Sequence, residues 1–352
     1  MHSYMEGIIL YCLSKLNGER SISGLYHLLK GKKSSQTIQD GHLFGISCFF
    51  GVYPSITREA LLELQKQFAE RGLLNAVTNN YAVSQLGMKE LRIFFERYPL
   101  LEHINGWEIQ NRAEVFWKRL SLMIQAVSYL VRNEKEYLPI QKDQQIQNWV
   151  KQYIKSLKGN RFEIPEKLYE ELFGLLNEVS EREQKVFILR LSSPVRTGLT
   201  YRQIADELQI EESYGYFLFL NTLHYMVAEV SRHRGRFGLL AGMAEVPRDS
   251  GKAVTQSTFA TYKLIQSGLT KEQIAAARRL KVSTIEDHMV ELAFMDEGFD
   301  ISPYLRPGLE ADILSIARLH KTKKLKDIKG RLAEEASYFQ IRLVLARYGE
   351  NV

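Results

Sequence analysis

The chain has 352 residues, of which 45% are hydrophobic, and its net charge at pH 7 is +6. This length predicts two or three domains, and the composition excludes wholesale disorder. No apolar run approaches the roughly 20 residues of a membrane helix, so we expect no membrane contact, whereas the mild positive charge permits nucleic-acid binding without requiring it.

The first third of the chain, residues 1–134, has the pattern of a helical, winged-helix-like domain. Two short helices flank a basic turn that contains Lys32 and Lys33. An amphipathic helix follows at 57–71, and an alternating stretch at 81–87 then ends in glycine, which is typical of the wing of a winged helix. The segment fits a winged helix that docks on DNA or protein, and it fits equally a small helical bundle with a basic turn.

The middle third begins with polar residues 135–165, for which we predict a linker or domain boundary. Residues 166–236 then have the pattern of a helix-turn-helix domain. Ser180 and Glu183 form a capping box, and a further helix starts at Thr200. Through Ser180-Glu-Arg-Glu and Leu199-Thr200-Tyr, this block resembles the promoter-binding end domain of bacterial sigma factors, which implies a helix-turn-helix.

The second helix of this middle unit departs from a DNA-reading helix, because its face is aromatic. Base reading needs outward Arg, Lys, Asn or Gln side chains. We therefore predict a packing or partner-binding role for this face, carried by Tyr214, Tyr216, Phe217 and Phe219. Residues 237–254 are predicted to be a second linker.

The last third, residues 255–352, carries the clearest motif. A helix-turn-helix pattern is formed by Thr270, Ile274, Ala275, Leu280 and Ile285. The spacing keeps the first helix and the turn apolar on the inside, Ala275 is small where the helices cross, and Ser283 or Thr284 is expected to cap the second helix. Arg279 occupies the place in the turn where glycine is usual.

Together with a basic stretch at 321–331, this motif resembles the helicase-associated helix-turn-helix domain at the C-terminus of RecQ-type DNA helicases. We predict helices at 309–320 and 325–335 and a last one at 337–348. The predicted DNA contacts are Arg278, Arg279, Lys281, Thr284, Lys321, Lys323, Lys324, Lys326, Lys329 and Arg331, with Lys32 and Lys33 from the N-terminal turn. A solvated charged surface is the competing interpretation of the 321–331 run.

The same sequence lacks the motifs of a motor or a cofactor site. A phosphate-binding loop needs a Gly separated by four residues from Gly-Lys-Ser/Thr, but Val246 stands at that place before Gly251-Lys252, and Ala253 follows. Cys12 and Cys48 have no paired ligands at zinc spacing. We therefore predict no catalytic residues, no metal and no cofactor.

The order of the segments resembles the YpbB-like proteins of Gram-positive bacteria. This resemblance implies a mainly α, multi-domain array of helix-turn-helix and winged-helix units with small β wings. It also implies a non-enzymatic accessory protein that partners a RecQ-type helicase and binds DNA, forked or single-stranded rather than one duplex site, in repair or replication-fork processing. We expect it in the cytoplasm, with the nucleoid. The alternatives are a helix-turn-helix transcription regulator and a protein-interaction module without DNA binding.

Overall fold

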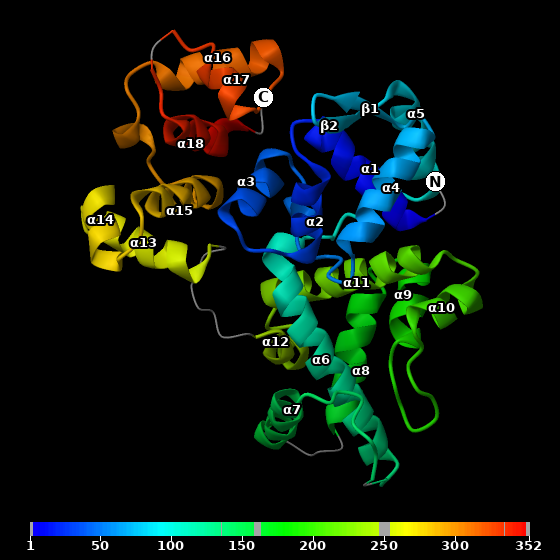
Figure 1. Cartoon of the computed structure of the whole chain (residues 1–352). Helices are drawn as coiled ribbons and strands as arrows, with labels where there is room; N and C mark the ends of the chain where they lie inside the picture. The colour runs from blue at the N-terminus through cyan, green and yellow to red at the C-terminus, as the bar shows by residue number, and fades with distance from the viewer. Residues whose placement is uncertain (1–2, 135, 158–162, 246–253, 334, 350–352) are drawn as a thin grey trace. The chain divides into compact units, whose positions relative to one another are not determined.

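The computed structural model describes residues 3–134, 136–157, 163–245, 254–333 and 335–349 (Figure 1). The fold is mainly α, which confirms the predicted class. In the first part of the chain the elements are α1 (Tyr4–Leu16), α2 (Ile22–Lys30), α3 (Ser35–Leu43), η1 (Ser47–Phe49), α4 (Arg58–Glu70), β1 (Leu74–Val77), β2 (Asn80–Val83), α5 (Gln85–Arg97) and α6 (Gly106–Val131).

The remaining elements are also helical. They are α7 (Gln144–Ser156), α8 (Glu163–Leu176), α9 (Glu181–Leu189), α10 (Tyr201–Leu208), α11 (Glu212–Arg232), α12 (Gly238–Ala244), α13 (Gln256–Gln266), α14 (Lys271–Arg278), α15 (Val282–Met295), η2 (Ser302–Tyr304), α16 (Leu309–His320), α17 (Leu325–Lys329) and α18 (Tyr338–Tyr348).

The contacts divide the chain into two compact units. The central unit contains residues 1–8 and 92–247, and the terminal unit contains residues 9–91 and 248–352. Each unit is built from two separate stretches of the chain, whereas the sequence predicted consecutive domains. Those domain boundaries stay a prediction. Residues 246–253, which include Gly251-Lys252, lie outside the described residues.

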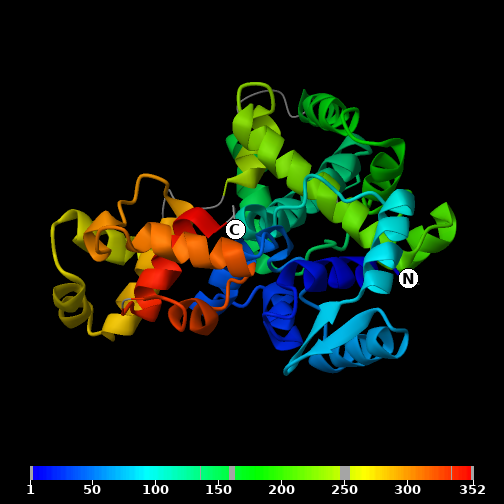
Figure 2. The ribbon, with the colours of Figure 1, turned by 90° about the horizontal axis from the view of Figure 1, so that it is seen from above.

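The terminal unit begins with a winged-helix arrangement. Helix α4 starts at a Thr57 cap that accepts the Ala60 N–H, and the antiparallel hairpin β1–β2 follows it. The register pairs Leu74 with Val83 and Val77 with Asn80, so the wing lies at residues 74–83, earlier than the predicted 81–87, because α5 already begins at Gln85. Helix α3 of this part packs against α15 and α18 from the other end of the sequence. The views in Figures 1 and 2 show α13 to α15 beside α16 to α18.

The central unit is built around α11, which packs against α6, α9, α10 and α12. The two segments predicted as linkers are partly helical. Helix α7 lies within 135–165 and buries Ile146 and Val150, and it packs on α6. Helix α12 lies within 237–254 and is buried along most of its length. The amide N–H groups of Leu239 and Leu240 at its start donate to the buried Glu171 carboxylate at 3.0 and 2.9 Å.

Candidate nucleic-acid interface

Within the described part of the chain, four helix–turn–helix turns share one backbone geometry. In each, the residue that ends the first helix adopts the left-handed conformation, and the next N–H donates to the carbonyl five residues earlier. The left-handed residues are Gly31, Gln209, Arg279 and Lys321. The backbone bonds join Lys32 to His27, Ile210 to Ala205, Leu280 to Ala275 and Thr322 to Ala317. The sequence predicted the first three turns, and the structure adds the one between α16 and α17.

Two of these units are near copies in their capping chemistry. Thr200 with Gln203 and Thr270 with Gln273 are capping boxes, with the reciprocal side-chain and backbone bonds both made. Arg279 has φ 53°, as expected from its place in the turn, and Gln209 has φ 52°. The scaffold is therefore the same in both units while the charges on the turn differ.

The predicted cap of α15 is wrong. Neither Ser283 nor Thr284 caps it, because only three residues separate α14 from α15 and Lys281, the last of them, takes the N-cap position without a side-chain bond. The helix thus begins before the two hydroxyl residues. Ile274, Ala275 and Ile285 are buried in the core of this part, as predicted.

Helix α15, the second helix of the C-terminal motif, is largely buried. It packs against α13, α14, α18 and α3. Its acidic side chains face its own unit. Lys271 donates to Glu286 at 2.7 Å, Arg342 pairs with Asp287, and Glu291 accepts from the Thr255 N–H at 2.6 Å and the Thr258 hydroxyl at 2.7 Å. These carboxylates therefore do not face an approaching phosphate, and only the first turn of α15 is open to a groove.

Arg278, whose DNA contact stays a prediction, is hydrogen-bonded inside the unit. Its guanidinium donates to the Ser257 carbonyl at 2.7 Å, the Ser257 hydroxyl at 3.0 Å and the Thr261 hydroxyl. Burial lowers its pKa below the usual range. These bonds hold α14 against α13, so Arg278 serves the fold.

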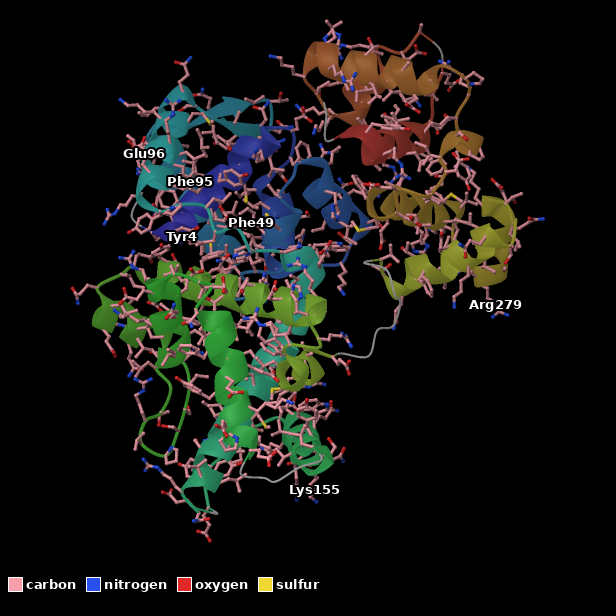
Figure 3. All side chains as sticks on the ribbon, turned by 180° about the vertical axis from the view of Figure 1, so that it is seen from behind. Tyr4, Phe49, Phe95, Glu96, Lys155 and Arg279 are labelled. Atoms are coloured by element: carbon pink, nitrogen blue, oxygen red, sulfur yellow. The ribbon has the colours of Figure 1, made fainter. Side chains whose placement is uncertain are left out.

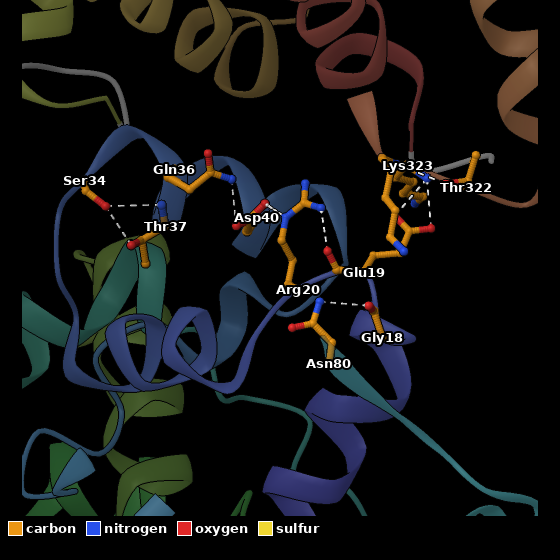
Figure 4. A network of polar contacts seen from close by, with 11 residues as sticks. Gly18, Glu19, Arg20, Ser34, Gln36, Thr37, Asp40, Asn80, Thr322 and Lys323 are labelled. Atoms are coloured by element: carbon orange, nitrogen blue, oxygen red, sulfur yellow. Dashed lines mark hydrogen bonds and ion pairs between the residues drawn. The ribbon is translucent and has the colours of Figure 1, made fainter. Parts of the chain in front are cut away.

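Lys323, another predicted contact, is also committed to the fold (Figure 4). Its N–H donates to the two Glu19 carboxylate oxygens at 2.9 and 3.1 Å, and its ammonium donates to the Leu43 carbonyl at 2.9 Å. Burial raises the pKa of Glu19 although these bonds oppose the rise. A short distance away, Arg20 pairs with Asp40 at 2.7 Å.

The other predicted DNA contacts differ in exposure. The exposed ones are Lys32, Lys33, Arg279, Lys281, Lys321, Lys326 and Arg331, and the half-buried ones are Thr284, Lys324 and Lys329. The Lys329 ammonium lies 4.8 Å from the centre of the Tyr338 ring, and Arg331 donates to the Asp327 carbonyl at 2.8 Å. Helix α17 ends at Lys329 rather than at the predicted Glu335, because the chain turns at Gly330.

Arg279 and Lys281 together form the most accessible basic element of the C-terminal motif, which we call the basic turn. Arg279 lies at the outer end of α14 (Figure 3). The equivalent positions of the middle motif are Gln209, which also ends its helix in the left-handed region, and Glu211, which also takes the N-cap position. One turn is basic and the other is neutral to acidic on the same backbone.

The aromatic face predicted for partner binding is mostly inside the central unit. Tyr214 is 6% exposed, Phe217 is fully buried and Phe219 is 4% exposed, whereas Tyr216 is half-buried. Tyr214 and Phe217 pack on Tyr4, with ring centroids 5.1 and 5.3 Å apart. The packing role is therefore carried by the chain itself for three of the four residues.

Metal-ion clusters and membrane spans were searched for among the described residues. In that part of the chain, no group of three or more His, Cys, Asp or Glu side chains could hold a metal ion. No described helix combines the length and the apolar character needed to cross a membrane.

A family model described as a helix-turn-helix domain matches residues 257–345, and such a domain suggests DNA binding. The chain is 34% identical over 347 residues to protein YpbB of Bacillus subtilis (strain 168), a match that covers 98% of this chain and 97% of that relative. No solved structure matches the chain.

Proposed function

The chain belongs to the YpbB family, and from that premise we propose that it is a non-catalytic accessory protein that binds DNA and partners a RecQ-type DNA helicase. Its place would be in repair or replication-fork processing. The resemblance of its C-terminal segment to a domain that RecQ-type enzymes hold in their own chain supports the partnership. The helix-turn-helix match supports the DNA contact.

The single observation that carries the DNA part of the proposal is the basic turn. Arg279 and Lys281 are exposed at the turn between α14 and α15, while the carboxylates of α15 are bonded to groups of the same unit. Cations at this place would contact phosphates, and phosphate contacts position a protein without reading sequence. Because α15 is buried beyond its first turn, the geometry favours DNA binding with little sequence preference over a transcription regulator.

Neutralising the basic turn should weaken DNA binding for all sequences alike. We expect the double variant Arg279→Gln, Lys281→Gln to lose affinity for a forked oligonucleotide, and its log–log salt dependence should become shallower by about two. Anisotropy titrations at several salt concentrations measure both quantities. The matched control neutralises two exposed cations of the central unit, Lys167→Gln and Arg202→Gln. Equal affinity and salt slope in parent and turn variant would remove this turn from the interface.

The helicase partnership predicts a gain of function in trans. A domain held in cis acts at a high local concentration, so a detached domain must recover that advantage by binding the motor. The full chain should co-elute with a RecQ-type helicase that lacks its C-terminal domain, and it should increase unwinding of forked DNA by that helicase. Alone, it should neither hydrolyse ATP nor unwind DNA.

The control for this experiment is the basic-turn variant in the full chain. Cutting the chain near residue 250 would separate the two segments of the terminal unit, whereas the point variant leaves the unit whole. The variant should co-elute as the parent does and stimulate less. Absence of both co-elution and stimulation by the parent would end the helicase proposal, and a strong preference for one duplex sequence would favour the regulator.

The burial of the second helices supports a second candidate, a protein-interaction module. Helices α3, α11 and α15 are all buried over most of their length, so their reading faces are used in packing. If both the parent and the basic-turn variant bind the helicase and neither binds DNA, the protein is such an interaction module.

A further inference from the structure

A cleft of about 700 Å³ lies inside the terminal unit, where α1, α3 and α16 end. Its basic lining comes from segments distant in the sequence. Lys15 lies in the last turn of α1, and Arg318 lies in the last turn of α16. Lys321 directly follows α16, and Lys323 lies two residues further along the chain. Leu43 contributes an apolar wall from α3. The volume falls within the roughly 300–1,000 Å³ of small-molecule sites.

The charges of the lining favour an anion. Four cationic side chains face one carboxylate, that of Glu19, which already accepts two bonds from the Lys323 N–H. Three helix C-termini oppose this, since each carries about half a negative charge. Together they offset only about half of the net positive charge of the side chains, so the cleft remains positive.

Capping of those helix ends does not account for all the cations. The Lys323 ammonium caps α3 through the Leu43 carbonyl, and the Lys15 ammonium lies 5.4 Å from the centre of the Tyr11 ring. Within the described residues, however, the side chains of Arg318 and Lys321 make no hydrogen bond or ion pair, and both are exposed. The two cations at the end of α16 are therefore available to a ligand.

We infer that this cleft binds a ligand with clustered phosphate groups, of about the size of a nucleotide. The Arg318 guanidinium can bind phosphate oxygens in pairs, and Lys321 and Lys15 add point charges. A free nucleoside diphosphate and the phosphorylated end of a nucleic-acid strand share this chemistry. The inference is independent of the helicase partnership and of the basic turn, because it concerns different residues and needs no DNA duplex.

The test compares three probes on the full-length protein at low salt: inorganic pyrophosphate, ADP and a 5′-phosphorylated single-stranded oligonucleotide. Calorimetry follows the first two and anisotropy the third. The double variant Arg318→Gln, Lys321→Gln should bind its ligand about tenfold more weakly than the parent, as expected when charge-assisted bonds are lost. The variant Lys321→Arg, which keeps the charge, should retain binding.

The outcomes separate the two sources of phosphate. Loss of pyrophosphate and ADP binding in the double variant assigns the cleft to a free nucleotide, and loss of oligonucleotide binding alone assigns it to a strand end. The Lys167→Gln, Arg202→Gln control should match the parent for every probe. Circular dichroism melting checks that each variant is folded. The inference is overturned if the parent binds none of the probes, or if the double variant binds them as the control does.

Discussion

Lowering the pH from 7 to 5 should reduce the free energy of unfolding of this protein by several kcal/mol. Three histidines carry the effect: His224 and His288, which are buried, and His42, which is half-buried. Burial is the main cause that lowers the pKa of each from 6.5 to about 4, and the Arg278 charge also acts on His288. In the unfolded chain they take up protons near pH 6.5, whereas the folded chain resists until about pH 4.

The sign follows from where the protons bind. The stabilising contribution of each neutral histidine is complete above pH 6.5 and is lost as the pH falls toward 4, because the unfolded state then binds more protons. Between pH 7 and 5 each histidine contributes on the order of 2 kcal/mol to this loss. Glu19 and Glu291, whose pKa values burial raises, act in the opposite direction, so the histidine share must be measured with a variant.

His224 offers that measurement. Its Nδ1 accepts the Asn105 N–H at 3.0 Å, so the ring hydrogen is on Nε2, 2.9 Å from the Gln110 side-chain oxygen. A second ring proton would have to face the Asn105 N–H. The variant His224→Gln should therefore lose about 2 kcal/mol of the pH dependence, whatever its stability at pH 7.

Tryptophan fluorescence makes this measurement specific to one unit. All three tryptophans, at 107, 117 and 149, belong to the central unit, as His224 does. Urea unfolding at pH 7 and at pH 5 gives the two free energies. The control is the exposed His320→Gln in the terminal unit. An unchanged pH dependence in His224→Gln would show that His224 titrates alike in the folded and unfolded chains.

Removing the Phe219 ring should destabilise the central unit by about 3 kcal/mol, as truncation of buried aromatic residues does. Its ring centroid lies 4.7 Å from that of Trp117, edge to face, and 5.9 Å from that of Phe187. The variant Phe219→Ala would leave a cavity among these rings. Urea unfolding followed by tryptophan fluorescence measures the change from the shift of the midpoint at constant slope.

The matched control is Phe173→Ala, in the same unit, because Phe173 is 53% exposed and its loss leaves no cavity. It should unfold within about 1 kcal/mol of the parent. If Phe219→Ala unfolds like this control, the aromatic face of α11 does not stabilise the central unit through packing. If it is destabilised yet still binds DNA and helicase under native conditions, Phe219 acts through packing and not as a contact.

The sequence alone determined the local units of this protein. The capping box of Ser180 and Glu183, the spacing from Ile274 to Leu280 and the hairpin after α4 all depend on residues a few positions apart, so their chemistry is visible in a short window. The same window contained the signal for α7, since Ile146, Val150 and Tyr153 recur at helical spacing. The prediction of a linker there gave the polar composition too much weight.

The helices on both sides of the α16–α17 turn were predicted, but the likeness of this turn to the others was missed. Unlike the turns at Gln209 and Arg279, it lacks a Thr-x-x-Gln cap and an apolar turn residue, with Lys321 and Thr322 at the turn. Which segments make up each unit could not be predicted from short stretches of sequence, because the terminal unit joins residues 9–91 to residues 248–352.

Only the tertiary structure decided which cations remain available for phosphate. Arg278 and Arg279 are neighbours in the sequence, yet the first is hydrogen-bonded to Ser257 and Thr261 and the second is exposed. Lys323 is bonded to Glu19, which lies 304 positions earlier in the chain. A basic residue in the sequence shows that a charge is present, but its use depends on the carboxylates and carbonyls that folding brings within hydrogen-bond distance.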